Sequence, residues 1–161
     1  MTQAIRYAAL GSSRATMSRL GPAHPSKSAT AAMHRFPPVE DLRYLVGTTL
    51  TQITVDPYQV SFLLTDDGRA TTLTSQYAFE FEQPNGQVEV YRPDRKSSNF
   101  SPVHFHQLLD SKVQSIDLSP DGLRLTLRFE RGLQLTVLSE LDSYEAGTIA
   151  CGGGSQKYWV F

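Results

Sequence analysis

The stretch that decides the fold is Leu108–Ser139, LLDSKVQSIDLSPDGLRLTLRFERGLQLTVLS, because it repeats an earlier part of the chain. Eight apolar or proline positions recur at a constant offset of 63, as Pro57 does at Pro120. The earlier members are Leu45, Leu50, Ile53, Val55, Pro57, Val60, Phe62 and Leu64, and the later ones are Leu108, Val113, Ile116, Leu118, Pro120, Leu123, Leu125 and Leu127. After a one-residue shift, Gly68, Thr72, Leu73 and Ser75 recur as Gly132, Thr136, Val137 and Ser139. We therefore interpret the chain as a duplicated β unit.

Both copies carry the alternation that is typical of half-buried strands. In the second copy, apolar and polar residues alternate along Leu123–Glu130, which is the cleanest such pattern in the sequence. Val60–Leu64 and Tyr77–Glu82 alternate in the same way in the first copy. Asp66-Asp67-Gly68 and Pro120-Asp121-Gly122 are turn sequences, because glycine supplies the positive φ that a tight turn needs. The pattern predicts antiparallel strands joined by short turns.

A short helix is expected in front of each copy. Proline and acidic residues precede Leu42–Val46, and Gly47 is a helix stop. Ser101-Pro102 predicts a helix over Val103–Leu109. The predicted fold class is therefore mainly β with two short helices, in which two related antiparallel units of three to four strands pack as a sandwich or partly open barrel.

The chain of 161 residues fits one domain, and its organisation follows the repeat. Residues 38–161 are expected to form a single β-rich domain, with repeat 1 at about 42–91 and repeat 2 at about 102–161. Arg92–Asn99 is predicted to be the exposed connector. In repeat 2 we expect a further strand over Asp142–Ala150, a flexible turn over Cys151–Ser155 and a terminal strand over Lys157–Phe161.

Residues 1–37 differ from the rest of the chain in composition. They are rich in serine, alanine, threonine and arginine and contain no acidic residue. Three interpretations stay open: a targeting segment, a disordered basic tail, and a start codon placed too early, since Met33 lies just before the domain. No uncharged stretch is long enough for a secretory signal, because Arg6, Arg14 and Arg19 interrupt it.

Charge and cysteine content exclude several classes. Residues 40–161 hold 10 basic and all 16 acidic side chains, a formal charge of −6, which argues against binding a nucleic-acid backbone. No apolar run approaches the roughly 18 residues that span a bilayer. A single cysteine, Cys151, excludes an internal disulfide and fits a cytoplasmic location. We expect no cofactor, and either a monomer or a homodimer.

The second copy resembles a bacterial family of small β-rich proteins of unknown function. The resemblance rests on Val113-x-x-Ile116-x-Leu118, Asp121-Gly122-x-x-Leu125-x-Leu127-x-Phe129, Gly132-x-x-Leu135-x-Val137 and Tyr144-Glu145. It covers about Leu42 to Phe161, with the first copy matching the family's front half. It implies an aromatic residue, typically tryptophan, two positions after the glutamate, where this chain has Gly147. Small β-rich immunity proteins, which neutralise toxins, are similar by loose analogy at the level of fold.

Two groups of residues are weighed as centres of chemistry. His104-x-His106 would share a metal ion on a strand but not on the predicted helix, where residues two apart lie roughly 200° apart. Cys151 beside Gly152-Gly153-Gly154 would be a nucleophile only with one of these histidines as base. Neither pairing is fixed by sequence, so the prediction is that the protein has no catalytic and no metal-binding residues.

Acidic and aromatic residues suggest a surface for a protein partner instead. Glu80 and Glu82 lie on the solvent side of an alternating strand, and Tyr144-Glu145 ends an acidic stretch near the C-terminus. Acidic groups steer association and tyrosine provides contact area, so these four residues are the predicted partner-binding residues.

The function expected from the sequence is that of a non-enzymatic protein-binding module, with an immunity-like role as one form. Two alternatives remain. One is a β domain that binds a small ligand in its interior, and the other is a small hydrolase that uses Cys151, His104 and His106.

Overall fold

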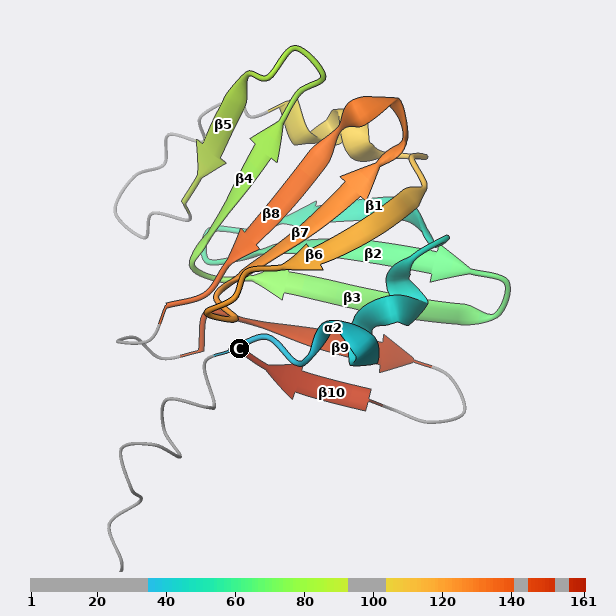
Figure 1. The fold of residues 1–161 in the computed structure, drawn as a ribbon, viewed down its shortest axis with the longest axis vertical. Coiled ribbons are helices and arrows are strands. Elements are labelled where there is room, and N and C mark those ends of the chain that lie inside the picture. The colour runs from blue at the N-terminus through green and yellow to red at the C-terminus, as the bar shows by residue number, and fades with distance from the viewer. Residues whose placement is uncertain (1–34, 93–103, 141–144, 153–156) are drawn as a thin grey trace, which may run out of the picture.

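The computed structural model describes residues 35–92, 104–140, 145–152 and 157–161, which form two packed antiparallel sheets of five strands each (Figure 1). The first sheet contains, in spatial order, β1 (Thr49–Val55), β2 (Val60–Asp66), β3 (Arg69–Ser75), β9 (Gly147–Gly152) and β10 (Lys157–Val160). The second contains β5 (Val88–Tyr91), β4 (Ala78–Glu82), β8 (Gln134–Leu138), β7 (Arg124–Phe129) and β6 (Val113–Leu118). The predicted fold class is confirmed as an open sandwich, and the sheets do not close into a barrel.

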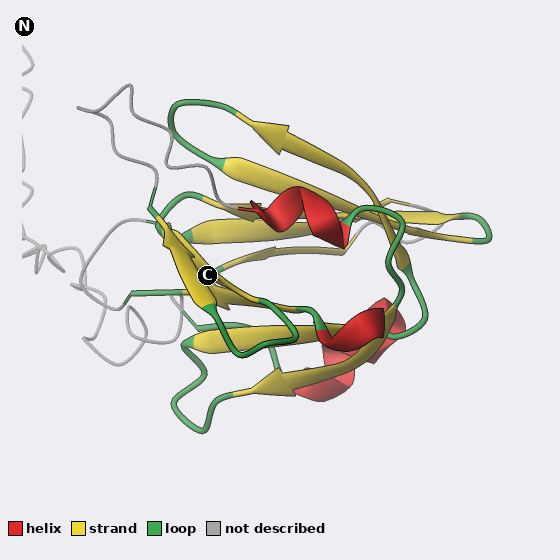
Figure 2. Ribbon diagram, turned by 90° about the horizontal axis from the view of Figure 1, so that it is seen from above, coloured by secondary structure: helices red, strands yellow, loops and turns green. Residues whose placement is uncertain are grey.

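In the part of the chain that the structure describes, helical structure is limited to short segments. They are α2 (Val39–Leu42) and three 3-10 helices: η1 (Arg43–Leu45), η2 (His104–Leu108) and η3 (Glu130–Gly132). Figure 2 shows them in red, lying against the strands rather than forming a layer of their own. Of the two predicted helices, the first is an α-helical turn continued as 3-10, and the second is entirely 3-10 within its described part.

The two copies of the sequence repeat have the same topology, and each copy contributes to both sheets. The first three strands of a copy form a meander in one sheet, and its last two cross to the other sheet. There the fourth strand of each copy pairs with the third strand of the other copy, so that β4 pairs with β8 and β9 pairs with β3. The fifth strand then pairs with the fourth of its own copy. Within the described ranges each copy therefore has five strands rather than three to four, and neither sheet belongs to one copy alone.

Backbone irregularities recur at the repeat offset. A β-bulge interrupts β1 between Leu50 and Gln52, and an equivalent bulge interrupts β6 between Val113 and Ser115. The two bulges are 63 residues apart in the sequence, which is the offset of the repeat. A duplicated unit explains this, because bulges are specific features of a strand's design.

Hydrogen bonds between the copies are reciprocal. Gly47 N–H donates to Val113 O at 2.8 Å, and the equivalent Asp110 N–H donates to Leu50 O at 2.9 Å. Val113 N–H also donates to Thr48 O, and Leu50 N–H to Ser111 O, at 2.9 and 3.0 Å. Here a residue of one copy contacts a second position in the other copy, and the equivalent residue of the other copy contacts that same position in the first. This reciprocity is typical of two-fold symmetric interfaces. The two copies thus pack around a pseudo-two-fold axis within one chain.

The inward faces of the two sheets form one hydrophobic core. Phe62, Phe79 and Phe105 meet edge to face, with ring centroids 5.2 to 6.5 Å apart. Leu125, Leu127 and Phe129 are buried as the alternation predicted, whereas Leu123 precedes β7 and is only partly buried. Burial of large apolar side chains at about 1.5–3 kcal/mol each drives this packing.

Helical segments pack against the edge strands β10 and β5 in similar ways. Tyr44 of η1 stacks on Trp159 of β10, with ring centroids 6.3 Å apart. In the other half, Phe105 of η2 packs against Tyr91 of β5 at 6.1 Å. As a result α2 and η1 lie between the inner face of the first sheet and the free edge of β6, which is the edge strand of the second sheet.

Three sequence expectations need correction: where the domain starts, where Cys151 lies and where the strand before it begins. Phe36 was assigned to the tail, but it is buried and its ring lies 4.1 Å from that of Phe161. Cys151 was expected in a flexible turn and instead belongs to β9, which begins at Gly147 rather than Asp142. The terminal strand is confirmed as β10. The connector Arg92–Asn99, except for Arg92, lies outside the described residues.

Candidate functional site

The candidate site is built on one side by the helical segment that precedes β1. Val39, Arg43 and Val46 are spaced by four and three residues, which puts them on one side of a helix. Leu42 and Leu45 point the other way and are fully buried. Val46 nevertheless remains 44% exposed, although it is a large apolar residue. The segment therefore presents a second stripe that the described residues leave uncovered.

The opposite side of the site is the free edge of β6. Ser119 N–H, just beyond this strand, donates to Arg124 O on the β7 side. Groups that bond to one neighbour alternate along an antiparallel strand, so the backbone groups of Ile116 and Leu118 point away from β7. Within the described part of the chain, neither residue has a hydrogen-bond partner on that side.

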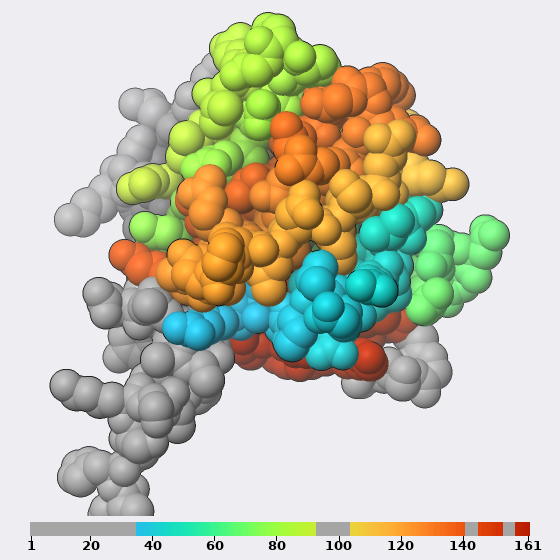
Figure 3. Space-filling model, viewed as in Figure 1, coloured from blue at the N-terminus to red at the C-terminus, as the bar shows by residue number. Residues whose placement is uncertain are grey.

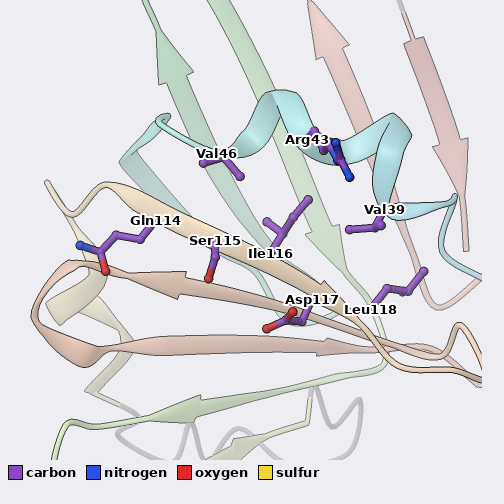
Figure 4. A pocket seen from close by; sticks show the side chains of 8 residues that line it. All are labelled: Val39, Arg43, Val46, Gln114, Ser115, Ile116, Asp117 and Leu118. Atoms are coloured by element: carbon purple, nitrogen blue, oxygen red, sulfur yellow. The ribbon is translucent and has the colours of Figure 1, made fainter.

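Together these elements enclose a groove of about 560 Å³, which we name the α2/β6 groove. It is lined by Val39, Arg43 and Val46 and by Gln114–Leu118 of β6 (Figure 4). The helical segment runs antiparallel to β6, with Val39 toward the Leu118 end of the strand and Val46 toward its Gln114 end. Figure 3 shows the two elements side by side, α2 in cyan and β6 in yellow-orange.

Of the two charged residues that line the groove, only one has a charged partner among the described residues. Asp117 on β6 is paired with Arg128, whose Nε lies 2.9 Å from a carboxylate oxygen. Arg43, in contrast, makes no ion pair with any residue that the structure describes. The helical side of the groove therefore carries a cation that is available to a ligand.

The predicted partner residues Glu80 and Glu82 lie on the outward face of β4, as the alternation indicated. Both are only partly exposed. A carboxylate oxygen of Glu80 lies 2.5 Å from Arg124, and Glu82 accepts a hydrogen bond from Gln134 at 2.9 Å. Their acceptors are engaged within the sheet, so this face is a paired polar surface rather than a free acidic patch.

The other two predicted partner residues lie near the start of β9. Glu145 is exposed and precedes Ala146, whose carbonyl accepts the N–H groups of Gln76 and Tyr77. Tyr144 falls outside the described residues. The described residues show no hydrogen bond or ion pair that joins Glu145 to Glu80 or Glu82.

Gly147 occupies the corner where the family resemblance implied a tryptophan. A Cβ placed there would lie 2.5 Å from Cζ of Phe161 and would also collide with the Thr74 carbonyl. The ring of the buried C-terminal Phe161 therefore fills the place of a side chain at position 147. An aromatic group is present at this corner, but it comes from the end of the chain.

The two histidines lie on η2, and His104 holds this helix to β5. Its ring Nδ1 lies 2.8 Å from Glu89 Oε1, and its backbone N–H donates to Glu89 Oε2 at 2.8 Å. The rings of His104 and His106 have centroids 6.1 Å apart and are tilted. Within the described residues no three His, Cys, Asp or Glu side chains are grouped as a metal site would need.

This contact predicts a specific dependence of stability on pH. The hydrogen bonds from the His104 backbone and side chain lower the pKa of Glu89 below its usual 4.5. A lowered folded-state pKa stabilises the fold above the unfolded value and loses that contribution as pH falls through the folded value. We therefore expect Glu89→Gln to reduce the loss of stability below about pH 4.5, measured by urea unfolding at several pH values. Glu145→Gln, at an exposed site, is the control and should leave that slope as in the wild type.

Cys151 lies in the first sheet, where it pairs with Thr71 and Lys157, whereas His104 bonds to a strand of the second sheet. Burial, and to a lesser extent the neighbouring Cys151, raise the pKa of the Tyr44 phenol to about 12. Tyr44 is thus protonated at neutral pH and is not a base. The described residues give the hydrolase hypothesis no nucleophile and base in contact.

Comparisons of the chain with protein families, with curated proteins and with solved structures gave no match. Among the described residues, no helix is both long and apolar enough to cross a membrane.

Sequence reasoning missed the α2/β6 groove. One signal was available, since Val39, Arg43 and Val46 share a helical side with two exposed members. That β6 is an edge strand, and that this helical segment lies beside it, depends on how the two copies exchange strands. No local pattern in the sequence carries that information.

Proposed function

We propose that this protein is a non-enzymatic protein-binding module that receives an extended segment of a partner protein in the α2/β6 groove. The observation that supports this most is the free edge of β6 facing the helical stripe of Val39, Arg43 and Val46. A sheet edge with unpaired N–H and C=O groups is a template for another strand. Here the helical segment lies beside that edge, so an incoming strand would gain side-chain contacts as well as backbone hydrogen bonds.

Strand addition explains how each part of the groove would act. The N–H and C=O groups of Ile116 and Leu118 would pair with the backbone of the incoming segment. Alternate side chains of that segment would point toward Val39 and Val46, because side chains alternate between the faces of a strand. Backbone pairing would supply affinity, and these side-chain contacts would supply specificity.

Val46→Asp tests this proposal. A carboxylate at the apolar wall would oppose burial against a ligand, so we expect the affinity for groove-binding peptides to fall at least about tenfold. Peptides are selected from a random decapeptide library displayed on phage, against the full chain, and their dissociation constants are measured by fluorescence anisotropy. Val55→Asp is the matched control, because Val55 is 40% exposed on β1, far along the other sheet. If the two variants lose affinity equally, the groove is not the binding site.

An immunity-like role is one form of this function, in which the partner is a toxin. The small β-rich architecture supports that form by analogy of fold alone. A toxin gene adjacent to the gene for this chain would support it directly. The proposal places the module in the cytoplasm, since the single Cys151 is compatible with a reducing compartment.

The alternative of a ligand between the sheets draws no support from the packing. Aromatic rings of Phe62, Phe79 and Phe105 occupy the centre of the interface, and the sheets do not enclose a barrel lumen. The partner surface first expected at Glu80 and Glu82 is also less favoured than the groove, because both carboxylates are paired within the sheet.

A further inference from the structure

We infer that the α2/β6 groove selects an extended segment of the form apolar-x-acidic-x-apolar, whose central carboxylate pairs with Arg43; this inference rests on the proposed function. Arg43 lies between Val39 and Val46 along the helical side of the groove. The helical side of the groove thus presents an apolar, a basic and an apolar side chain in that order. A complementary segment presents an apolar, an acidic and an apolar side chain toward it.

The lengths of the two elements match this spacing. From Val39 to Val46 the helical segment advances seven residues, or roughly 10–14 Å at the rises of α and 3-10 helices. Every second residue of a strand faces the same side, and four strand residues advance about 13 Å. Three successive inward side chains of a bound strand would therefore lie opposite the three wall residues.

The charge of the groove distinguishes an acidic segment from other occupants. Asp117 is neutralised by Arg128 at 2.9 Å, whereas Arg43 has no acidic partner among the described residues. A carboxylate from the ligand would compensate this exposed cation, and charge complementarity of this kind contributes to specificity.

The same charge argues that the segment comes from another protein. Four residues, 35–38, separate the chain's own residues 1–34 from the helical segment in the sequence, but residues 1–34 contain no Asp or Glu. They carry four basic side chains, which Arg43 would repel. The occupant we propose is therefore an acidic-apolar strand of a partner protein, rather than this N-terminal segment.

The test uses three synthetic versions of one library-selected peptide, with Glu, Gln or Lys at the central position, against the full-length chain. We expect the Glu peptide to bind about tenfold more tightly than the Lys peptide, and Arg43→Glu to reverse that preference. Arg131→Glu, an exposed change of equal charge on η3, is the control and should keep the wild-type preference. Melting temperatures check that both variants are folded. The comparison of the three peptides uses the unchanged protein, so it does not depend on either variant.

Amide hydrogen exchange at Ile116 and Leu118 separates the remaining outcomes. Protection that appears only when the Glu peptide is added supports both proposals. Protection with equal affinity for Glu, Gln and Lys overturns the acidic preference but retains strand addition. Absence of protection with any selected peptide overturns both. Protection in the free protein means that the chain itself or a second copy occupies the groove, which overturns an occupant from a partner protein.

Discussion

Leu125→Asp is expected to abolish soluble folding. Leu125 is fully buried in β7, where it pairs with Leu118 on one side and Val137 on the other. Loss of a buried leucine alone costs about 2–5 kcal/mol. The unpaired carboxylate that replaces it adds a desolvation penalty of several kcal/mol more. Since a domain is stable by only about 5–15 kcal/mol, the combined loss should exceed its stability.

Expression of soluble protein and a thermal melt measure this effect. Val90→Asp is the matched control, because it puts the same charge on a strand of the same sheet at a position that is 50% exposed. We expect the control to be soluble and folded. An unchanged melting temperature for Leu125→Asp would show that the alternating face of β7 is not part of the core.

Gly147→Ala is expected to destabilise the fold clearly, although it adds a single methyl group. That methyl would collide with the Thr74 carbonyl and would lie 2.5 Å from the Phe161 ring. The carbonyl cannot move freely, because Ser75 and Thr74 of β3 are in register with Gly147 and Thr148 of β9. Relief would require opening the junction between the two copies, at a cost of about 1–3 kcal/mol or more.

Urea unfolding measures this loss, and the same strand provides its control. Gly152→Ala places a methyl 3.5 Å from the Ala70 carbonyl, which is an ordinary van der Waals distance, so its stability should stay close to that of the wild type. The double variant Gly147→Ala, Phe161→Ala should not recover stability, because the backbone collision remains. If it recovers fully, the ring of Phe161 and not the strand pairing sets the requirement for glycine.

Hydrophobic periodicity explains why much of the fold could be predicted. The alternation along Leu123–Glu130 identifies β7 and its buried face without knowledge of any other strand. Turn sequences gave the hairpins in the same way, since Gly68 and Gly122 both have positive φ. The offset of 63 correctly implied two units of like topology. Each of these signals is local, or compares one local pattern with another.

The candidate site was not predictable in this way, because it depends on partners distant in the sequence. Glu80 and Glu82 were correctly placed on a solvent-facing side, but the sequence could not show that Arg124 and Gln134 lie beside them. Val46 looked like the end of an ordinary amphipathic helix. Its exposure next to the edge of β6 became visible only in three dimensions.

By itself the sequence determined that the chain is β-rich, that it consists of two related units, and which face of each strand is apolar. Only the tertiary structure decided that the last two strands of each unit cross to the other sheet, which leaves β6 at an edge beside α2. The physical reason is that periodicity fixes which face must be buried but not which surface buries it. Every apolar face can be covered by several alternatives, and the packing of the whole chain selects one.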